Sequence, residues 1–236
     1  MQISTSRRAG RTHRDRLQPC QDAFAVHVVE GRSRAAAAVA DGLGSRPLSH
    51  LGSEAASRAA AQSLGASGEW GPRAVHRAFR AARAAVERRA QELGASVEDL
   101  ATTLHVVGLS PGHMVAGSVG DGAILCVGSE PRLLLPPEES EYADAVVPVT
   151  HGQWQDHFRF ASATDATRVF LFTDGLTRLL LTHQSGAWAP YRPFFDAILP
   201  RPQDVGLAAR FLGSDHVDEA WDDDKCLVVM ALDEAA

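Results

Sequence analysis

Aspartates at the ends of short apolar runs constrain the fold of this 236-residue chain more than any other feature. Buried carboxylates are costly unless cations compensate them, so apolar strands bordered by aspartate favour a fold in which these ends meet around metal ions. Oxygen ligands without sulfur or paired imidazole are the set that hard divalent cations prefer. The pattern therefore predicts a two-metal hydrolase. These aspartates are Asp22, Asp41, Asp121, Asp174 and the run Asp222–Asp224.

The order of the expected elements indicates an α+β fold. Apolar residues of the longest helix (Val75, Phe79, Ala82 and Val86) recur at helical spacing. Helices and strands are segregated along the chain and do not alternate, which favours antiparallel sheets with helices outside them. With no internal repeat or linker, residues 1–236 are expected to form one domain. We expect strands at 24–29, 35–40, 102–109, 114–119, 123–127, 132–135, 168–173 and 225–232, helices at 49–64, 72–93, 175–181, 194–199 and 205–212, and no assignment for 136–167.

Composition excludes several classes of function. The net charge of −6 argues against a nucleic-acid partner, because nucleic-acid-binding surfaces are normally basic. No run of about 18 apolar residues exists, so no membrane span is expected. Three isolated cysteines without a CxxC pair fit the reducing cytoplasm, where we expect the protein to reside.

Taken together, the acidic motifs resemble those of the type 2C (PPM-type) metal-dependent protein serine/threonine phosphatases, in a bacterial branch. They stand in the family's order and cover residues from about 10 to 232. The resemblance implies a four-layer α-β-β-α sandwich of two antiparallel sheets flanked by helices. The motifs are Pro19-Cys20-Gln21-Asp22-Ala23, Val39-Ala40-Asp41-Gly42-Leu43-Gly44-Ser45, Ala101-Thr102-Thr103-Leu104, Val119-Gly120-Asp121, Phe172-Thr173-Asp174-Gly175-Leu176 and Asp223-Asp224-Lys225-Cys226-Leu227-Val228-Val229.

The resemblance also implies roles for individual residues around two or three Mg²⁺ or Mn²⁺ ions. Asp41 would bridge two metals, and the carbonyl of Gly42 would complete one site. Asp174 and Asp223 would bind the other metal, while Asp22 would hold metal-bound waters. Asp121 would form a weaker third site with Asp174, and Asp224, where the family often has Asn, would play a supporting role.

The implied reaction removes phosphate from phosphoserine or phosphothreonine by attack of a metal-bridging hydroxide. No phosphoenzyme is needed, which fits a chain without a Cys/His or Ser/His nucleophile arrangement. The implied partners are a phosphorylated protein and a cognate Ser/Thr kinase, and the protein is expected to be a monomer.

Two departures from the family pattern concern the substrate. Gln21 is neutral where the family commonly has Glu, which weakens one acidic contact to the second metal. Leu17 stands where many members carry a phosphate-gripping Arg, and we expect His13 and Arg16 to supply that contact from a displaced loop. Solvated N-terminal residues are the alternative interpretation.

A further departure concerns the proton donor. The segment after Asp41-Gly42 also lacks the histidine that acts as general acid in many members. His50 lies nearby, but we interpret it as a surface residue at a helix start. A metal-bound water could protonate the leaving alkoxide instead.

Two other functions are compatible with the sequence. The first is a catalytically weak or inactive relative that binds phosphoproteins as a regulatory module, as Gln21 and the missing Arg suggest. The second is a two-metal phosphodiesterase or nuclease on an unrelated fold, which the acidic charge and low aromatic content disfavour. The 136–167 region is expected to shape the groove beside the metals, with Trp154, Asp156 and His157 as candidate substrate contacts.

Overall fold

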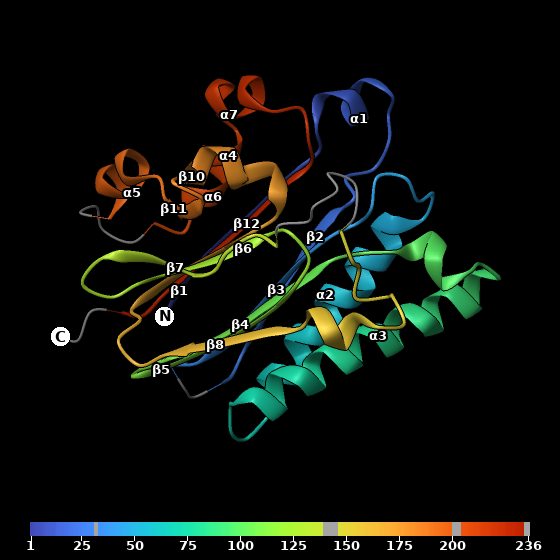
Figure 1. The fold of residues 1–236 in the computed structure, drawn as a ribbon, viewed down its shortest axis with the longest axis horizontal. Helices are drawn as coiled ribbons and strands as arrows, with labels where there is room; N and C mark the ends of the chain where they lie inside the picture. The colour runs from blue at the N-terminus through green and yellow to red at the C-terminus, as the bar shows by residue number, and fades with distance from the viewer. Residues whose placement is uncertain (31–32, 139–145, 200–203, 234–236) are drawn as a thin grey trace.

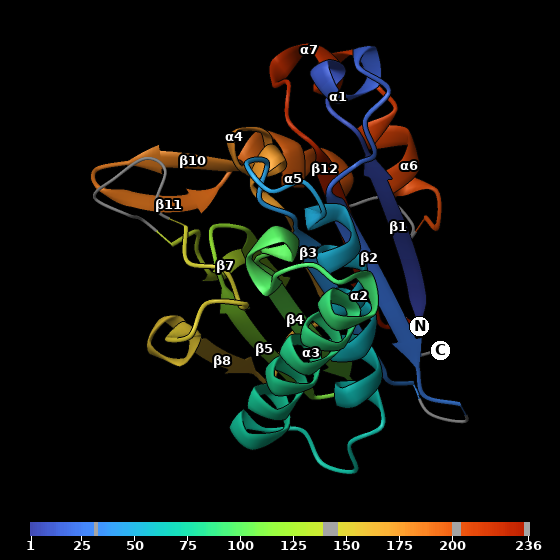
Figure 2. The same ribbon diagram turned by 90° about the vertical axis from the view of Figure 1, so that its right-hand side faces the viewer.

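A computed structural model describes residues 1–30, 33–138, 146–199 and 204–233. Two five-stranded sheets pack face to face, and helices cover both outer faces (Figures 1 and 2). Every strand pair within these sheets is antiparallel. The expected α+β sandwich of helix, sheet, sheet and helix layers is therefore confirmed.

In the first sheet, strand β3 (Ala35–Asp41) has apolar side chains on both of its faces. On β3, Ala36, Ala38 and Ala40 face the helices, whereas the intervening Ala35, Ala37 and Val39 face the other sheet. This two-residue period is that of a strand buried on both sides. In spatial order the strands are β2 (Asp22–Val28), β3 (Ala35–Asp41), β4 (Leu104–Ser110), β5 (His113–Val119) and β8 (Arg159–Ala163).

The second sheet repeats this alternation. On its central strand, Val169 and Leu171 face the first sheet, and Phe170 and Phe172 face the C-terminal helices. The sheet therefore separates an inter-sheet core from a second core beneath the C-terminal helices. In spatial order its strands are β1 (Gln2–Arg8), β12 (Lys225–Ala231), β9 (Arg168–Phe172), β6 (Ala123–Val127) and β7 (Pro131–Leu135).

The helices lie on opposite sides of the sandwich (Figure 1). The pair α2 (Ser49–Gly65) and α3 (Pro72–Leu93) covers the first sheet, and α4 (Thr177–Leu180), α5 (Arg192–Ile198), α6 (Leu207–Leu212) and α7 (Asp215–Ala220) lie over the second. The remaining short elements are α1 (Arg11–Asp15) and the 3₁₀ turns η1 (Val97–Leu100), η2 (Trp154–His157) and η3 (Asp174–Leu176).

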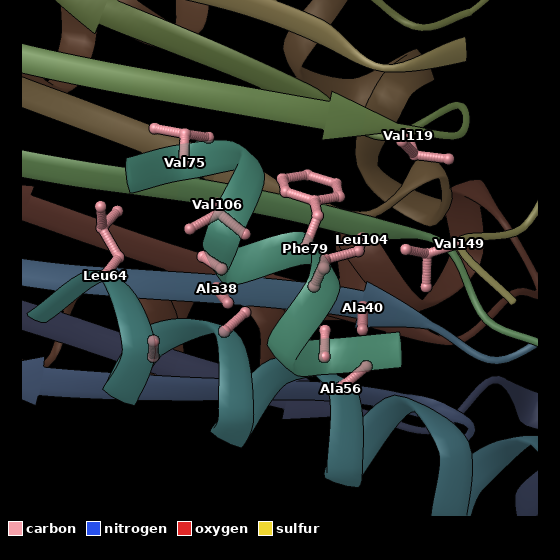
Figure 3. Close-up of a cluster of buried hydrophobic side chains, with 14 of the residues drawn as sticks. Ala38, Ala40, Ala56, Leu64, Val75, Phe79, Leu104, Val106, Val119 and Val149 are labelled. Carbon is pink, nitrogen blue, oxygen red and sulfur yellow. The ribbon is translucent and has the colours of Figure 1, made fainter. Parts of the chain in front are cut away.

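Small residues let α2 approach the first sheet closely. The alanines of β3 face Ala56 and its neighbours on α2, and Leu64, Val75 and Phe79 fill the wider spaces (Figure 3). Gly52 of α2 leaves no room for a side chain, because a Cβ there would lie 2.0 Å from the carbonyl oxygen of Leu100. The helix α3 begins with Pro72 and ends at Gly94, whose φ of +64° suits a glycine cap.

Several elements differ from the sequence-based expectation. The edge strands β1 and β8 and the short helices α1 and α7 were not predicted, because they bury few residues and carry weak apolar periodicity. The helix expected over 175–181 is wrong at its C-terminal end. There α4 stops at Leu180, and the hairpin β10 (Leu181–Gln184) and β11 (Ala187–Pro190) follows and projects from the molecule (Figure 2).

The unassigned 136–167 region contains η2 and β8, and its residues 139–145 lie outside the described part of the chain. Trp154 is buried against Phe79 and Phe158, so the structure contradicts its expected place at the substrate. Asp156 is exposed, and His157 Nδ1 lies 2.7 Å from Glu138. In the described residues, no helix is both long and apolar enough to cross a membrane.

Candidate metal centre and active site

The strand registers bring the predicted aspartates to one end of the sandwich. Asp22, which begins β2, is paired directly with Asp41, which ends β3. In the other sheet Ala123 is paired with Phe172, so Asp121, before β6, and Asp174, after β9, lie at the same end. These aspartates, which are far apart in the sequence, form one cluster because the end of one antiparallel strand lies beside the start of its neighbour.

A cavity of about 310 Å³ opens at this end. It contains most of the predicted site residues, drawn from both sheets and from the N-terminal segment. The lining residues are His13, Gln21, Asp41, Gly42, Leu43, Gly44, Thr103, Asp121, Val146, Asp174, Asp223 and Asp224.

The spacing of the carboxylates suits a metal ion. One oxygen from each of Asp41, Asp121 and Asp174 lies within 4.8 Å of the others. Oδ1 of Asp22 and Oδ1 of Asp121 are buried and have no hydrogen-bond partner. Buried polar atoms are normally satisfied, so these orphaned oxygens fit an environment completed by a hard cation and its waters.

Without a cation, the cluster strongly favours protonated carboxyl groups. Burial, then the charges of Asp121 and Asp223, raise the pKa of Asp174 to about 7. Burial and the neighbouring carboxylates also raise the pKa of Asp41 and of Asp22 well above its ordinary value. A divalent ion would reverse this balance by stabilising the ionised forms.

The metal-free protein is therefore expected to lose stability as the pH rises from about 5 to 8. The pKa of Asp174 in the folded protein lies above its ordinary value of 3.8, which applies to the unfolded chain. Between pH 5 and 8 the folded state therefore binds more protons than the unfolded state. The stabilising contribution of Asp174 is complete below the unfolded pKa and is lost as the pH passes the folded pKa, by about 1–3 kcal/mol. Thermal melts in EDTA across this range measure the loss, and saturating Mn²⁺ should offset it most at the upper end.

The control for this titration is Asp156→Asn, which removes an exposed carboxylate that does not line the cavity. Its melting temperature should follow the same pH dependence as the wild type. A melting temperature in EDTA that is flat or rises between pH 5 and 8 would contradict the raised pKa values.

The backbone around Asp41 is held by two threonines. Thr103 N–H donates to the carbonyl oxygen of Asp41 at 2.8 Å, and Thr103 Oγ1 accepts from Asp41 N–H at 3.0 Å. Thr102 Oγ1 also donates to the Asp41 carbonyl at 2.8 Å. These contacts orient the carboxylate at the end of β3 and explain the position of the Thr-Thr motif in the sequence.

The glycine after each aspartate allows close backbone approach. A Cβ on Gly42 would lie 2.7 Å from the carbonyl of Ser49, and one on Gly175 would lie 2.0 Å from the carbonyl oxygen of Asp224. Any side chain at Gly175 would thus push the Asp174 turn away from the loop that carries Asp223. The Asp-Gly pairs are needed for this convergence and do more than mark turns.

An arginine that the sequence motifs did not identify supports the loop that contains Asp121. Arg159, at the start of β8, donates to the carbonyl of Gly120 at 3.1 Å and to Ser118 Oγ at 3.0 Å. Its charge lowers the pKa of Asp121, although burial, the larger effect, raises it. Arg159 lies in the unassigned segment, so no motif marked it.

A buried histidine completes this support. His105 Nδ1 lies 2.9 Å from Ser118 Oγ, and its Nε2 accepts from Gly122 N–H at 3.2 Å. Burial lowers the pKa of His105 to about 3, so the ring is neutral and Nδ1 is the donor. The structure therefore gives His105 a structural place behind Asp121.

The loop of residues 222–224 is fixed by a buried lysine and by the N-terminal segment. Lys225 Nζ donates to the carbonyls of Trp221 (2.5 Å) and Asp223 (2.7 Å). Asp222 accepts from Thr12 N–H at 2.9 Å and from the Thr12 hydroxyl. Asp223 is left facing the cavity, where burial and then Asp224 raise its pKa.

The structure separates the two residues predicted to contact phosphate. His13 lines the cavity, whereas Arg16 is exposed and is not among the lining residues. Leu17, where the family often has Arg, is 93% exposed, and its φ of +55° turns the chain outward. Gln21 lines the cavity and His50 does not.

Comparison with known proteins identifies the family. The family model described as protein phosphatase 2C matches residues 9–213. No match is found among curated proteins. Several solved structures with a similar fold are described as bacterial serine or serine/threonine phosphatases, and at 12–16% identity their likeness is one of fold.

Three of these structures illustrate the likeness. A bacterial serine phosphatase has a TM-score of 0.72 and 12% identity, covering 100% of this chain and 99% of that chain. The serine/threonine phosphatase Stp1 from Staphylococcus aureus has a TM-score of 0.70 and 12% identity, covering 99% and 96%. The serine/threonine phosphatase PstP/Ppp of Mycobacterium tuberculosis has a TM-score of 0.69 and 16% identity, covering 98% of each chain. With a family model matched over most of its length, this chain belongs to the protein phosphatase 2C family.

Proposed function

We propose that this protein is a metal-dependent phosphomonoesterase that removes phosphate from phosphoserine and phosphothreonine side chains of proteins. The observation that carries the proposal is the convergence of Asp41, Asp121 and Asp174, whose oxygens lie within 4.8 Å of one another in a family of phosphatases. The Ser/Thr phosphatases of similar fold support the substrate class.

The family resemblance assigns the residues that would hold two or three Mg²⁺ or Mn²⁺ ions, and the presence of Asp41, Gly42, Asp121, Asp174 and Asp223 in the cavity lining supports that assignment. Asp41 would bridge two ions, and the Gly42 carbonyl would complete one of their sites. Asp174 and Asp223 would bind the second ion, and Asp121 would form a third site with Asp174. Asp22 is buried beside Asp41 and its carboxylate accepts a hydrogen bond from Thr173 Oγ1 at 2.6 Å, which suits an outer supporting role.

When bound, the divalent ions would supply an activated water and neutralise charge on the phosphoryl oxygens. The thiol of Cys20, which precedes Gln21 and Asp22, does not offer a competing covalent route. Burial, then the carboxylates of Asp22 and Asp224, raise the pKa of the Cys20 thiol, so it stays protonated and is a poor nucleophile. Direct attack of water on phosphorus is therefore the reaction that this site supports best.

A direct assay tests the proposal. The purified protein with saturating Mn²⁺ should hydrolyse para-nitrophenyl phosphate and a phosphothreonine peptide, and EDTA should abolish both activities, because removal of the metal ions leaves the carboxylate cluster to repel the phosphate and removes the activated water. Complete inactivity toward both substrates would contradict the proposal. Much faster cleavage of bis-para-nitrophenyl phosphate would indicate a phosphodiesterase.

The second candidate is a phosphoprotein-binding module with little or no activity. It is favoured by the neutral Gln21 in the cavity lining and by the outward-turned Leu17. This hypothesis expects no more than one tightly bound metal. Calorimetric titration that finds two Mn²⁺ sites in the wild type and none in Asp41→Asn would exclude it.

The phosphodiesterase or nuclease hypothesis required an unrelated fold, and that part is wrong because the chain belongs to the protein phosphatase 2C family. The cognate kinase, the monomeric state and the cytoplasmic location stay predictions.

A further inference from the structure

His13 occupies a distinctive place at the mouth of the cavity. It lies on α1, in the segment that joins β1 to β2, and 24% of its side chain is exposed. Among the described residues, it is the one histidine that lines the cavity with Asp41, Asp174 and Asp223. The ring therefore borders the same cavity as the carboxylates that would hold the phosphoryl group.

The orientation of the ring is set by Asp224. His13 Nδ1 lies 2.9 Å from Asp224 Oδ1, and the Asp224 side chain is 3% exposed. The same carboxylate accepts from Gly10 N–H at 2.7 Å and from Gln21 N–H at 2.5 Å. A carboxylate that accepts from these donors also accepts from His13, so Nδ1 carries a hydrogen and Nε2 is the nitrogen left for a ligand.

The segment that carries His13 is held at several points. Arg14 forms a two-pronged ion pair with Asp218, at 2.9 and 2.8 Å, and Thr12 is bound to Asp222. These contacts tie α1 to α7 and to the loop before β12. The histidine is thus placed by tertiary contacts on both sides of it and not by a free surface loop.

The site needs a proton donor at the leaving oxygen. The alkoxide of serine or threonine is a strongly basic leaving group, and positioned acids accelerate its departure. The segment after Asp41-Gly42 contains no histidine, and His50 does not line the cavity. His13 is therefore the side chain best placed to supply this proton.

The geometry points to His13 as the general acid of the reaction and to Asp224 as its positioning residue, an assignment that rests on the proposed phosphatase function. As the P–O bond to the serine or threonine oxygen breaks, its electron pair stays on that oxygen, and the protonated His13 gives it the Nε2 proton. The attacking water forms the new P–O bond and releases a proton to solvent. The products are the free hydroxyl side chain and phosphate, and neutral His13 regains a proton from solvent.

Leaving-group dependence tests this assignment. In the Mn²⁺-loaded full chain, His13→Asn should lower kcat for a phosphothreonine peptide about 100-fold, the scale of general acid catalysis. It should change kcat for para-nitrophenyl phosphate less than about 3-fold, because nitrophenolate leaves as a stable anion without a proton. His50→Asn, a histidine outside the cavity, should leave both rates at the wild-type level.

Asp224→Asn should show the same selectivity for the basic leaving group with a smaller loss. The double variant with His13→Asn should be no slower on the peptide than His13→Asn alone, because paired groups act as a unit. Melting temperatures and calorimetric Mn²⁺ affinities near the wild-type values establish that the variants fold and bind metal. If His13→Asn melts early, His13→Gln replaces it in the same comparison.

The outcomes separate the two levels of the proposal. An equal loss on both substrates, or no loss on the peptide, would overturn the role of His13 while leaving the phosphatase function intact. A wild-type protein inert toward both substrates would overturn the proposed function and this assignment with it.

Discussion

Replacing Asp41 with asparagine is expected to lower kcat/KM for a phosphothreonine peptide by at least ~10³-fold, or about 4 kcal/mol of transition-state stabilisation. Asp41 lies at the centre of the cluster, where it shares close oxygen spacing with Asp121 and Asp174. A neutral amide cannot bridge two cations, so Mn²⁺ affinity should fall with activity. Steady-state kinetics and calorimetric Mn²⁺ titration measure the two losses.

The same substitution should stabilise the metal-free protein. Burial first, and then Asp22, Asp174, Asp121 and Asp223, raise the pKa of Asp41, so its ionised form is repelled by its neighbours. Removing that charge should raise the free energy of unfolding near pH 8 by about 1–2 kcal/mol, or roughly 2–6 °C in melting temperature.

The control is Asp99→Asn, which removes a capping carboxylate that does not line the cavity and should lower stability slightly. If Asp41→Asn instead destabilised the metal-free protein and left Mn²⁺ binding unchanged, Asp41 would be a structural residue and not a ligand.

Replacing Phe79 with alanine should give the largest loss of stability, about 3–5 kcal/mol, because the cavity left behind adds to the lost burial. Phe79 is fully buried on α3 between the helices and the first sheet (Figure 3). Its ring packs against Trp154 and Phe158, with centroid distances of 5.8 and 5.0 Å. Urea unfolding of the two proteins measures the difference.

This loss should reach the active site. Trp154 and Val149 belong to the same core as Phe79, and Val146, three residues before Val149, lines the cavity. A loosened core should therefore reduce the order of this wall and lower kcat/KM modestly, by about 1 kcal/mol or less. The control is Leu93→Ala, at the C-terminal end of the same helix, where the leucine is 40% exposed. This substitution should change the free energy of unfolding by about 1 kcal/mol or less. Similar losses for the two variants would contradict the assigned core.

Much of the fold was predictable because its central elements carry strong periodic signals. Strands such as β3, β9 and β12 are buried on both faces, so their apolar runs are continuous and bordered by aspartate. The amphipathic pattern of α3 marked the helix layer. The edge strands β1 and β8 could not be predicted from the sequence, because an edge strand buries less of each residue and shows a weaker apolar pattern.

The candidate site divides along the same line. Asp41, Asp121, Asp174 and Asp223 could be selected from the sequence because each borders a strand, and strand ends meet. The supporting contacts could not be selected, because they join residues remote in sequence. Arg159 reaches Gly120 from the segment left unassigned by the sequence pattern, and Thr12 donates to Asp222, 210 residues further along the chain.

Local chemistry by itself therefore determined the carboxylate set, the kind of cation it suits and the sandwich that gathers it. Burial and long-range hydrogen bonding decided the rest. Arg16 and His13 are equally plausible phosphate contacts in the sequence, yet only His13 reaches the cavity. The reason is a contact between His13 and Asp224, 211 residues apart, which no local pattern encodes and which exists only once the sheet of β2 packs against the sheet of β12.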